Sequence, residues 1–427
     1  MAESAITNRK QDYFIPIIII GALFFIFGFV TWLNATLIPY LRIACELTAF
    51  ESFWVTFAFY ISYFVMALPS SAVLEKTGFK NGMSVGLITM ALGALIFIPA
   101  ALTRTYGLFL TGLFVQGTGL AILQTASNPY VTILGPIESA ARRISIMGVA
   151  NKFAGILSPI ILGAIVLEGI DDLVVRLGLM NEVEKAAELD ILAARVIFPY
   201  VIMALVLLIL AGLVRFSSLP DVEREEETTD MKAVSDRTSL WQYPYLWLGA
   251  MTIFVYVGVE VIAVDTLISY GNFLGFEFSE ARFFASFTLG AMIVGYFFGI
   301  IAIPKFITQE KALKYFAILG IIFTVIAVFS NGFSSILMIA ALGFANSIMW
   351  PAIWPLAIDG LGKFIKVGSA ILIMGIAGGA LLPLLYGYLA DLESVQAQNA
   401  YWIMVPCYVF ILFFAAKGNR IGKIIVK

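Results

Sequence analysis

Three ionisable side chains lie inside long apolar stretches of this sequence: Lys152, Glu260 and Asp265. If these stretches cross a lipid bilayer, a charge there costs at least about 2.5 to 3.5 kcal/mol, so each residue is a candidate for a functional site. A buried ammonium needs an opposite charge, and we expect Lys152 to pair with a carboxylate. The alternative is that its flexible stem carries the charge to the lipid headgroups.

The two carboxylates are candidates for binding a proton or a cation. Glu260 and Asp265 are five positions apart, so on a regular helix they point roughly 140° apart. Both can face one cavity only if the helix is broken or irregular there. Gly258 is the expected place for such a break, because glycine adds backbone flexibility.

The composition excludes most enzyme chemistry. Histidine is absent, and Cys45 and Cys407 are far apart, so Ser-His or Cys-His catalysis and the usual zinc sites lack their residue types. The net charge of −2 lacks the basic footprint of nucleic-acid binding. We therefore expect neither an enzyme nor a nucleic-acid-binding protein, and no cofactor.

The long apolar stretches predict an all-α, multi-pass membrane protein. The 427 residues are 61% hydrophobic and 13% charged, whereas soluble domains carry about 25% charged residues. Twelve stretches of about 18 to 29 residues can each cross a hydrocarbon core of about 30 Å. The expected spans are 14–38, 53–74, 82–102, 106–134, 144–167, 195–216, 245–271, 282–303, 312–330, 334–358, 367–390 and 399–416.

Loop charges and loop lengths predict the topology. With both termini in the cytoplasm, most of the 26 Lys and Arg lie on the cytoplasmic side, as the positive-inside rule requires. The charged segment 217–243 reads as a cytoplasmic linker between a first half, 1–216, and a second half, 244–427. Residues 168–194 have helical periodicity and are expected to form a helical cap on the outer side.

An internal repeat predicts how the spans are arranged. Residues 154–163 (AGILSPIILG) match 378–387 (GGALLPLLYG) at an offset of 224. Residues 35–38 (ATLI) match 265–268 (DTLI) at an offset of 230. Twelve helices in two pseudo-symmetric six-helix halves, with a site between them at mid-membrane, are the major facilitator arrangement.

Four motifs carry a resemblance to one transporter family. Residues 124–136 (QTASNPYVTILGP), 256–260 (YVGVE), 346–351 (NSIMWP) and 359–363 (DGLGK) resemble motifs of the L-fucose:proton symporter family, which also contains glucose/galactose transporters and sodium-coupled glucose carriers. The resemblance covers all twelve spans. It implies a sugar substrate, and it makes Asn151 similar to the family's substrate-side asparagine.

The sequence departs from the proton-coupled relatives at two acids. The fucose carrier's proton-carrying aspartate follows an asparagine that resembles Asn34, and Ala35 stands at that position here. The family's span-four glutamate is Gln124. Proton coupling through those two positions is excluded. Because Asp265 is the repeat partner of Ala35, we expect the coupling carboxylate in the second half.

The resemblance to sugar carriers identifies residues that suit a sugar. Amides can pair with its hydroxyls, and aromatic rings can lie against its apolar face. The expected substrate-binding residues are Asn34, Gln124, Asn128, Asn151, Lys152, Tyr256, Glu260, Asn346, Trp350 and Trp354. The alternatives are helix-to-helix hydrogen bonds for the amides and packing or an interfacial position for the tryptophans.

These observations predict a cation-coupled hexose symporter that works by alternating access. Asp265 and Glu260 are the expected coupling residues, for a proton or for sodium bound near them. The alternatives are an uncoupled sugar uniporter and a carrier of an anionic sugar with Lys152 as counter-charge. We expect a monomer in the inner (plasma) membrane, with the sugar and the lipid bilayer as its partners.

Overall fold

The structure is a computed structural model that describes residues 14–133, 140–217, 219, 239–303, 305–361 and 364–423. Every regular element in these ranges is a helix. The first half contains α1 (Phe14–Thr31), α2 (Asn34–Ala44), α3 (Ala49–Ser52), α4 (Trp54–Leu102), α5 (Tyr106–Ile133), α6 (Ala140–Val166), α7 (Ile170–Leu177), α8 (Glu182–Ala194) and α9 (Ile197–Phe216). The short η2 (Leu240–Gln242) lies at the end of the linker. The second half contains α10 (Pro244–Asp265), α11 (Leu267–Phe273), α12 (Phe278–Ala281), α13 (Phe284–Ala302), α14 (Gln309–Phe329), α15 (Phe333–Ser347), α16 (Met349–Ile358), α17 (Ile365–Met374), η4 (Gly375–Ala377), α18 (Gly378–Asp391), α19 (Gln396–Ala400), η5 (Tyr401–Ile403), α20 (Met404–Ala416) and η6 (Gly418–Arg420).

The helices confirm a multi-pass membrane protein. Each expected span coincides with one helix or with consecutive helices. Eleven helical segments of the described residues are long and apolar enough to cross a membrane. The number is eleven because Ala49–Leu102 runs through two expected spans, 53–74 and 82–102. Within α4, Gly78 has φ 74°, which strains residues with a side chain, so α4 is two helices joined at a kink.

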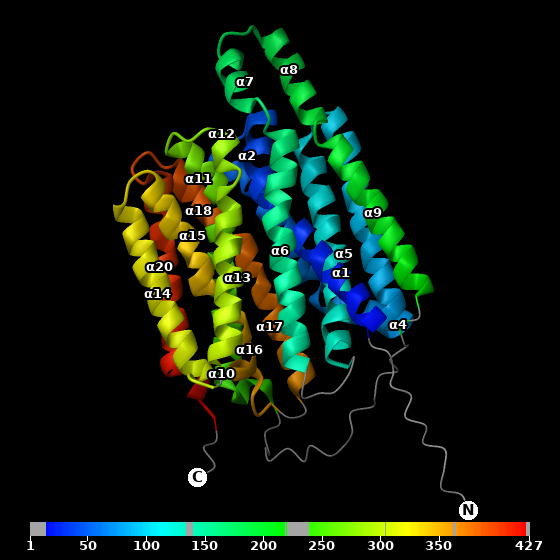
Figure 1. The fold of residues 1–427 in the computed structure, drawn as a ribbon, viewed down its shortest axis with the longest axis vertical. Coiled ribbons are helices and arrows are strands. Elements are labelled where there is room, and N and C mark those ends of the chain that lie inside the picture. Colours follow the sequence, from blue (N-terminus) through cyan, green and yellow to red (C-terminus); the bar gives the residue numbers. More distant parts are fainter. Residues whose placement is uncertain are drawn as a thin grey trace, which may run out of the picture.

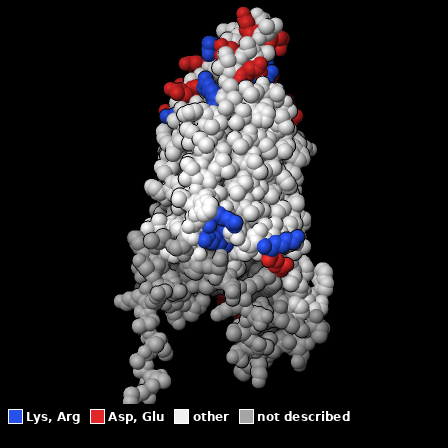
Figure 2. All heavy atoms as spheres, turned by 90° about the vertical axis from the view of Figure 1, so that its right-hand side faces the viewer, with Lys and Arg blue, Asp and Glu red and all other residues white. Residues whose placement is uncertain are grey.

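The two halves stand side by side, with α7 and α8 projecting at one end (Figure 1). We call this the cap end; α9 and α20 finish at the opposite end. Between the halves, α6 packs against α13 and α4 packs against α18. Figure 2 shows charged residues at the cap end and near the opposite end, with a broad uncharged band between them, as a bilayer requires.

Four spans are interrupted part-way along their length. The breaks lie at Trp32–Leu33 between α1 and α2, at Thr266 between α10 and α11, at Ile348 between α15 and α16, and at η4 between α17 and α18. The repeat-related first and seventh spans are both interrupted, and discontinuous helices commonly frame transporter sites. The expected break at Gly258 is wrong. There α10 is continuous, and it ends only at Asp265, where the Thr266 hydroxyl bonds Ile262 O at 2.7 Å and Tyr401 at 2.6 Å.

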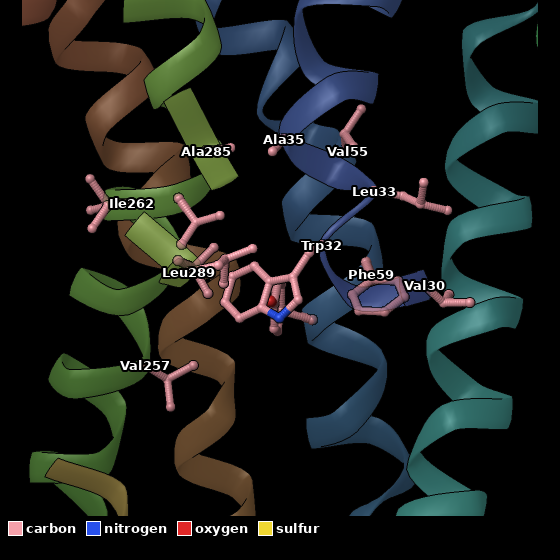
Figure 3. Close-up of a cluster of buried hydrophobic side chains, with 14 of the residues drawn as sticks. Val30, Trp32, Leu33, Ala35, Val55, Phe59, Val257, Ile262, Ala285 and Leu289 are labelled. Carbon is pink, nitrogen blue, oxygen red and sulfur yellow. The ribbon is translucent and has the colours of Figure 1, made fainter. Parts of the chain in front are cut away.

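A buried apolar cluster joins the two halves next to the first break. It contains Val30, Trp32, Leu33, Ala35, Val55 and Phe59 from the first half, and Val257, Ile262, Ala285 and Leu289 from the second. Figure 3 shows Trp32 reaching from the α1–α2 junction toward Leu289 and Ile262. The polar residues described next are therefore held between packed apolar side chains.

Candidate functional site

An ion pair between Lys152 on α6 and Glu260 on α10 joins the two halves. Lys152 Nζ donates to Glu260 Oε1 at 2.9 Å, and the two side chains are only 9% and 10% exposed. Lys152 is therefore paired with a carboxylate of the opposite half, as the sequence predicts. The alternative, in which Lys152 extends to the lipid headgroups, does not agree with this structure.

Trp32 covers the ion pair. Lys152 Nζ lies 4.4 Å from the centroid of the Trp32 ring, a cation–π distance. The ring fits against α6 because residue 155 is a glycine, and a Cβ there would overlap the ring. Trp32 Nε1 is buried and has no hydrogen-bond partner among the described residues. The indole thus holds the ammonium in place and keeps a donor that a ligand could satisfy.

Asp265, the last residue of α10, contacts the first half at a second point. Its side chain is fully buried, and Thr56 Oγ1 on α4 donates to Asp265 Oδ2 at 3.2 Å. Asp265 Oδ1 has no hydrogen-bond partner in the described part of the chain. A buried carboxylate with one hydrogen bond is costly in its charged form, which favours a bound proton or cation. The Asp265 and Thr56 oxygens are the kind of ligand that a small, hard metal cation prefers.

The two carboxylates share one regular helix because they face different helices of the first half. Glu260 reaches α6, and Asp265 reaches α4. The expected conflict between their directions disappears, since the first half surrounds that side of α10 with more than one helix. In the described part of the chain, Glu260 is therefore paired with a lysine, whereas Asp265 has no countercharge at hydrogen-bond distance.

On the second half, several predicted residues lie near Glu260. Tyr256 and Tyr408 both lie within electrostatic range of the Glu260 carboxylate. The Tyr408 hydroxyl donates to Asn346 Oδ1 at 2.9 Å, while the buried Asn346 Nδ2 has no described partner. The Tyr256 and Trp350 ring centroids are 6.4 Å apart. Tyr256 and Tyr408 therefore lie near Glu260, and Tyr408 links this region to Asn346.

Trp350 and Trp354 extend this aromatic surface along α16. Their rings stack with centroids 5.4 Å apart, and both side chains are half-buried. Their spacing of four residues places them on one face of the helix. A half-buried indole surface continuous with Tyr256 can accept the apolar face of a ring-shaped ligand.

The first half contributes an amide and a phenol that point to each other. Gln124 Nε2 on α5 donates to Tyr63 Oη on α4 at 3.2 Å. Tyr63 also stacks with Tyr60 at 6.3 Å, and Tyr60 lies within electrostatic range of Asp265 and Glu260. Gln124 is therefore connected to the acids through two tyrosines.

The remaining predicted amides differ in their surroundings. Asn151, half-buried beside Lys152, donates to Phe24 O at 3.3 Å and so makes a helix-to-helix hydrogen bond. Asn34 is 1% exposed, and both of its amide atoms lack a described partner. The Asn128 side chain lies outside the described residues. The binding role of each remains a prediction.

Thr56, Tyr60, Tyr63 and Tyr408 belong to this site and were missed in the sequence. The repeat held a signal for Thr56, since Ser286 stands 230 positions later. Ser286 Oγ donates to Ile156 O at 2.8 Å, so both hydroxyls make hydrogen bonds between the halves. No comparable pattern distinguishes Tyr408, which is one of 17 tyrosines.

A membrane bundle with charged side chains at the boundary of two six-helix halves is the architecture of a transporter. A sequence profile of the Major Facilitator Superfamily matches residues 20–383, and the chain belongs to this superfamily. Within it, the chain belongs to the family that contains glucose/galactose transporters and L-fucose-proton symporters. It is therefore a carrier rather than an enzyme.

Three comparisons define these relationships. The glucose/galactose transporter of Brucella abortus biovar 1 (strain 9-941) is 36% identical over 97% of this chain and 96% of its own length. The L-fucose-proton symporter of Escherichia coli (strain K12) is 30% identical over 96% of this chain and 94% of its own length. The crystal structure of the transporter FucP in the outward conformation has a TM-score of 0.71 and 28% identity, covering 96% of this chain and 99% of that one.

Proposed function

We propose that this chain is a cation-coupled hexose symporter working by alternating access. The observation that carries the proposal is the difference in surroundings between the two acids of α10. Lys152 neutralises Glu260, whereas Asp265 is buried and has one hydrogen bond, from Thr56, among the described residues. The first acid holds the halves together beside the aromatic surface, and the second can bind the driving cation. The named relatives support a sugar as the substrate.

The transport cycle follows from the unfavourable free energy of a charged Asp265 carboxylate without a bound cation. Charged and unpaired, this carboxylate is expensive in the closed interface, so the empty carrier favours a state in which water reaches it. A bound proton or sodium ion neutralises it and allows the halves to close around the sugar. The cation thereby shifts the equilibrium by its different affinity for the two states.

The sugar site comprises the residues around the ion pair. The unpartnered Trp32 Nε1 and Asn346 Nδ2 provide donors, and Gln124 and Asn151 provide further amide groups. The tryptophan pair on α16 provides the flat apolar surface. We further propose that the carrier works as a monomer in the inner membrane with both termini in the cytoplasm.

An anionic sugar is the second candidate substrate, because Lys152 lies at the centre of the site. Its charge is already matched by Glu260, which leaves little for an anion. Competition between labelled glucose and an excess of neutral hexoses or hexuronates separates the two. Stronger competition by hexuronates would reassign the substrate class.

The decisive experiment is counterflow and uptake in proteoliposomes with a panel of sugars, repeated under sodium and pH gradients. The proposal expects exchange of a hexose without a gradient and accumulation when one cation gradient is imposed. Exchange without accumulation under either gradient identifies a uniporter. Absence of exchange for every sugar in the panel contradicts the sugar assignment itself.

A further inference from the structure

The cap end is closed by hydrogen bonds from one half to the other. Asp391, which ends α18 in the second half, accepts from the backbone amides of α3 in the first half. Ala49 N donates to Asp391 Oδ1 at 3.0 Å, and Phe50 N donates to Asp391 Oδ2 at 2.7 Å. One carboxylate therefore binds two neighbouring amides of the opposite half.

A second carboxylate accepts from one backbone amide across the halves in the reverse direction. Asp171 on α7 belongs to the first half, and the Phe278 amide belongs to α12 of the second half. Phe278 N lies 3.1 Å and 3.0 Å from the two Asp171 oxygens. We call the Asp391 and Asp171 interactions the two closing contacts.

The short helices bound in the two closing contacts are related by the internal repeat, although the carboxylates themselves are not, since Asp391 matches Leu167 at the offset of 224. Helix α3 precedes the second span of the first half, and α12 occupies the same place in the second half. Gly387 on α18 and Gly163 on α6 are repeat partners at the offset of 224. A Cβ at Gly387 would overlap the ring of Phe53, which follows α3, and a Cβ at Gly163 would lie 3.2 Å from Arg282 Cβ, which follows α12. Gly387 therefore leaves room for the residue that follows α3, the helix that Asp391 binds. Gly163 leaves room for the residue that follows α12, the helix that Asp171 binds.

The cap, α7 and α8, is attached to the first half, so the hydrogen bond between Asp171 and Phe278 joins the two halves. Helix α8 is fixed to the first half by the Lys185–Glu46 ion pair and by Arg104–Asp190 at 3.3 Å. The Tyr40 hydroxyl on α2 adds a hydrogen bond to Leu192 O at 2.8 Å. When the halves separate at the cap end, the Asp171 contact to Phe278 must therefore break.

We propose that Asp171 and Asp391 are gating residues that stabilise the state closed at the cap end, one from each half. The inference rests on the alternating access proposed above but not on the sugar or the coupling ion. In the open state the two carboxylates are hydrated instead, so the contacts set the closed-to-open ratio rather than the transport chemistry. Because both carboxylates are partly solvated, we expect each to shift that ratio about threefold to tenfold.

The test measures access to a residue that the closed end buries. Ser52, on α3, is 1% exposed, and a cysteine there in a Cys45→Ser, Cys407→Ser background reports opening through its rate of maleimide labelling. The variants are Asp171→Ala, Asp391→Ala, their combination and Asp391→Asn, in purified detergent-solubilised protein. Labelling is expected to accelerate about threefold to tenfold for each alanine and about multiplicatively for both. Asp391→Asn retains one acceptor oxygen for two amides and should fall between the parent and the alanine variant.

Two controls separate opening from unfolding. Asp172→Ala removes the exposed carboxylate next to Asp171 on α7, which makes no hydrogen bond or ion pair with another described residue, so labelling of Ser52→Cys should stay within twofold of the parent. A cysteine in place of Ser84, buried between α4 and α9 away from the cap end, should label at the parent rate in every variant.

Each outcome decides the inference. Unchanged labelling in the Asp171/Asp391 double variant, or equal acceleration by Asp172→Ala, overturns it. Faster labelling at both Ser52→Cys and Ser84→Cys means loosening of the whole fold and also overturns it. A protein that shows the expected labelling but accumulates no sugar keeps the gate and rejects the symporter, so the two proposals fail separately.

Discussion

Lys152 Nζ and Glu260 Oε1 are 2.9 Å apart across the boundary between the two halves, under the ring of Trp32. Both charges are nearly excluded from water, so neither is tolerated alone without a large cost. Any movement that separates α6 from α10 must give each charge a new partner, such as water or a sugar hydroxyl. We therefore expect this ion pair to couple the conformation of the carrier to the contents of the proposed site.

Removing one member of the pair should be worse than removing both. Lys152→Met leaves the Glu260 charge, and Glu260→Gln leaves the Lys152 charge, buried without a countercharge, which costs about 3 to 5 kcal/mol. Both single variants should show a lower unfolding midpoint and lose coupled accumulation. The Lys152→Met/Glu260→Gln double variant should recover most of the midpoint, measured by thermal unfolding in detergent.

Lys152→Arg is the matched conservative change. It keeps the charge but alters the geometry of the single donor, so we expect partial accumulation. Full accumulation by Lys152→Met would mean that the ammonium has no part in transport.

Gln124 and Asn151 should contribute to sugar affinity. Replacing either with alanine removes an amide group of the proposed sugar site, and each lost hydrogen bond is worth about 0.5 to 1.5 kcal/mol, or roughly a threefold to tenfold rise in apparent KM. Uptake of labelled hexose over a concentration series measures this. Gln116→Ala is the control, because Gln116 is a buried amide on the same helix, next to Gly93 of α4. An unchanged KM in the Gln124→Ala/Asn151→Ala variant would show that the sugar binds elsewhere.

Tyr408 should act through Asn346. Tyr408→Phe removes the hydroxyl that donates to Asn346 Oδ1, leaving a buried amide without a described partner at a cost of about 1 to 3 kcal/mol. The expected result is a lower unfolding midpoint together with a higher KM, because the amide loses its fixed orientation. Cys407→Ala, which changes the neighbouring residue, should leave KM unaltered. A loss of stability with normal KM would assign Asn346 to packing alone.

Part of the site could be predicted because apolar stretches make rare residues conspicuous. A lysine in such a stretch has few possible partners, and Glu260 was one of two mid-span acids available to Lys152. The repeat and the twelve apolar stretches likewise predicted the two halves, since hydrophobic length and self-similarity are properties of the sequence itself.

The rest depends on how helices from different halves meet. Thr56 bonds Asp265 only because α4 and α10 adopt one particular register, and no local pattern encodes that register. The break on α10 was misplaced at Gly258 for a similar reason. Glycine permits a break, but the break occurs at Thr266, whose hydroxyl bonds Ile262 O and Tyr401.

Coupling and translocation should separate at Asp265. Asp265→Asn is neutral, like the cation-loaded carboxyl group, and can still accept the Thr56 hydrogen bond. The variant should exchange sugar in counterflow at a rate near the parent's but fail to accumulate it under a cation gradient. Thr56→Val, which removes the hydroxyl, should weaken coupling less, because the carboxylate remains. If Asp265→Asn accumulates sugar while Glu260→Gln does not, coupling belongs to Glu260; if both accumulate sugar, neither acid couples.

The repeat provides a final test of where the cation binds. Ala35, fully buried at the start of α2, is the repeat partner of Asp265. Transferring the carboxylate, with Ala35→Asp and Asp265→Ala together, keeps the number of buried acids constant. Because Asn34 beside it has two unsatisfied amide atoms, the transferred carboxylate has a potential hydrogen-bond donor nearby. Accumulation should be absent in Asp265→Ala and partly restored in the double variant, measured as the steady-state sugar gradient. Ala35→Asp alone, with two unpaired acids, should instead lower the unfolding midpoint, so a double variant that is stable yet does not accumulate sugar would show that the second-half position itself is required.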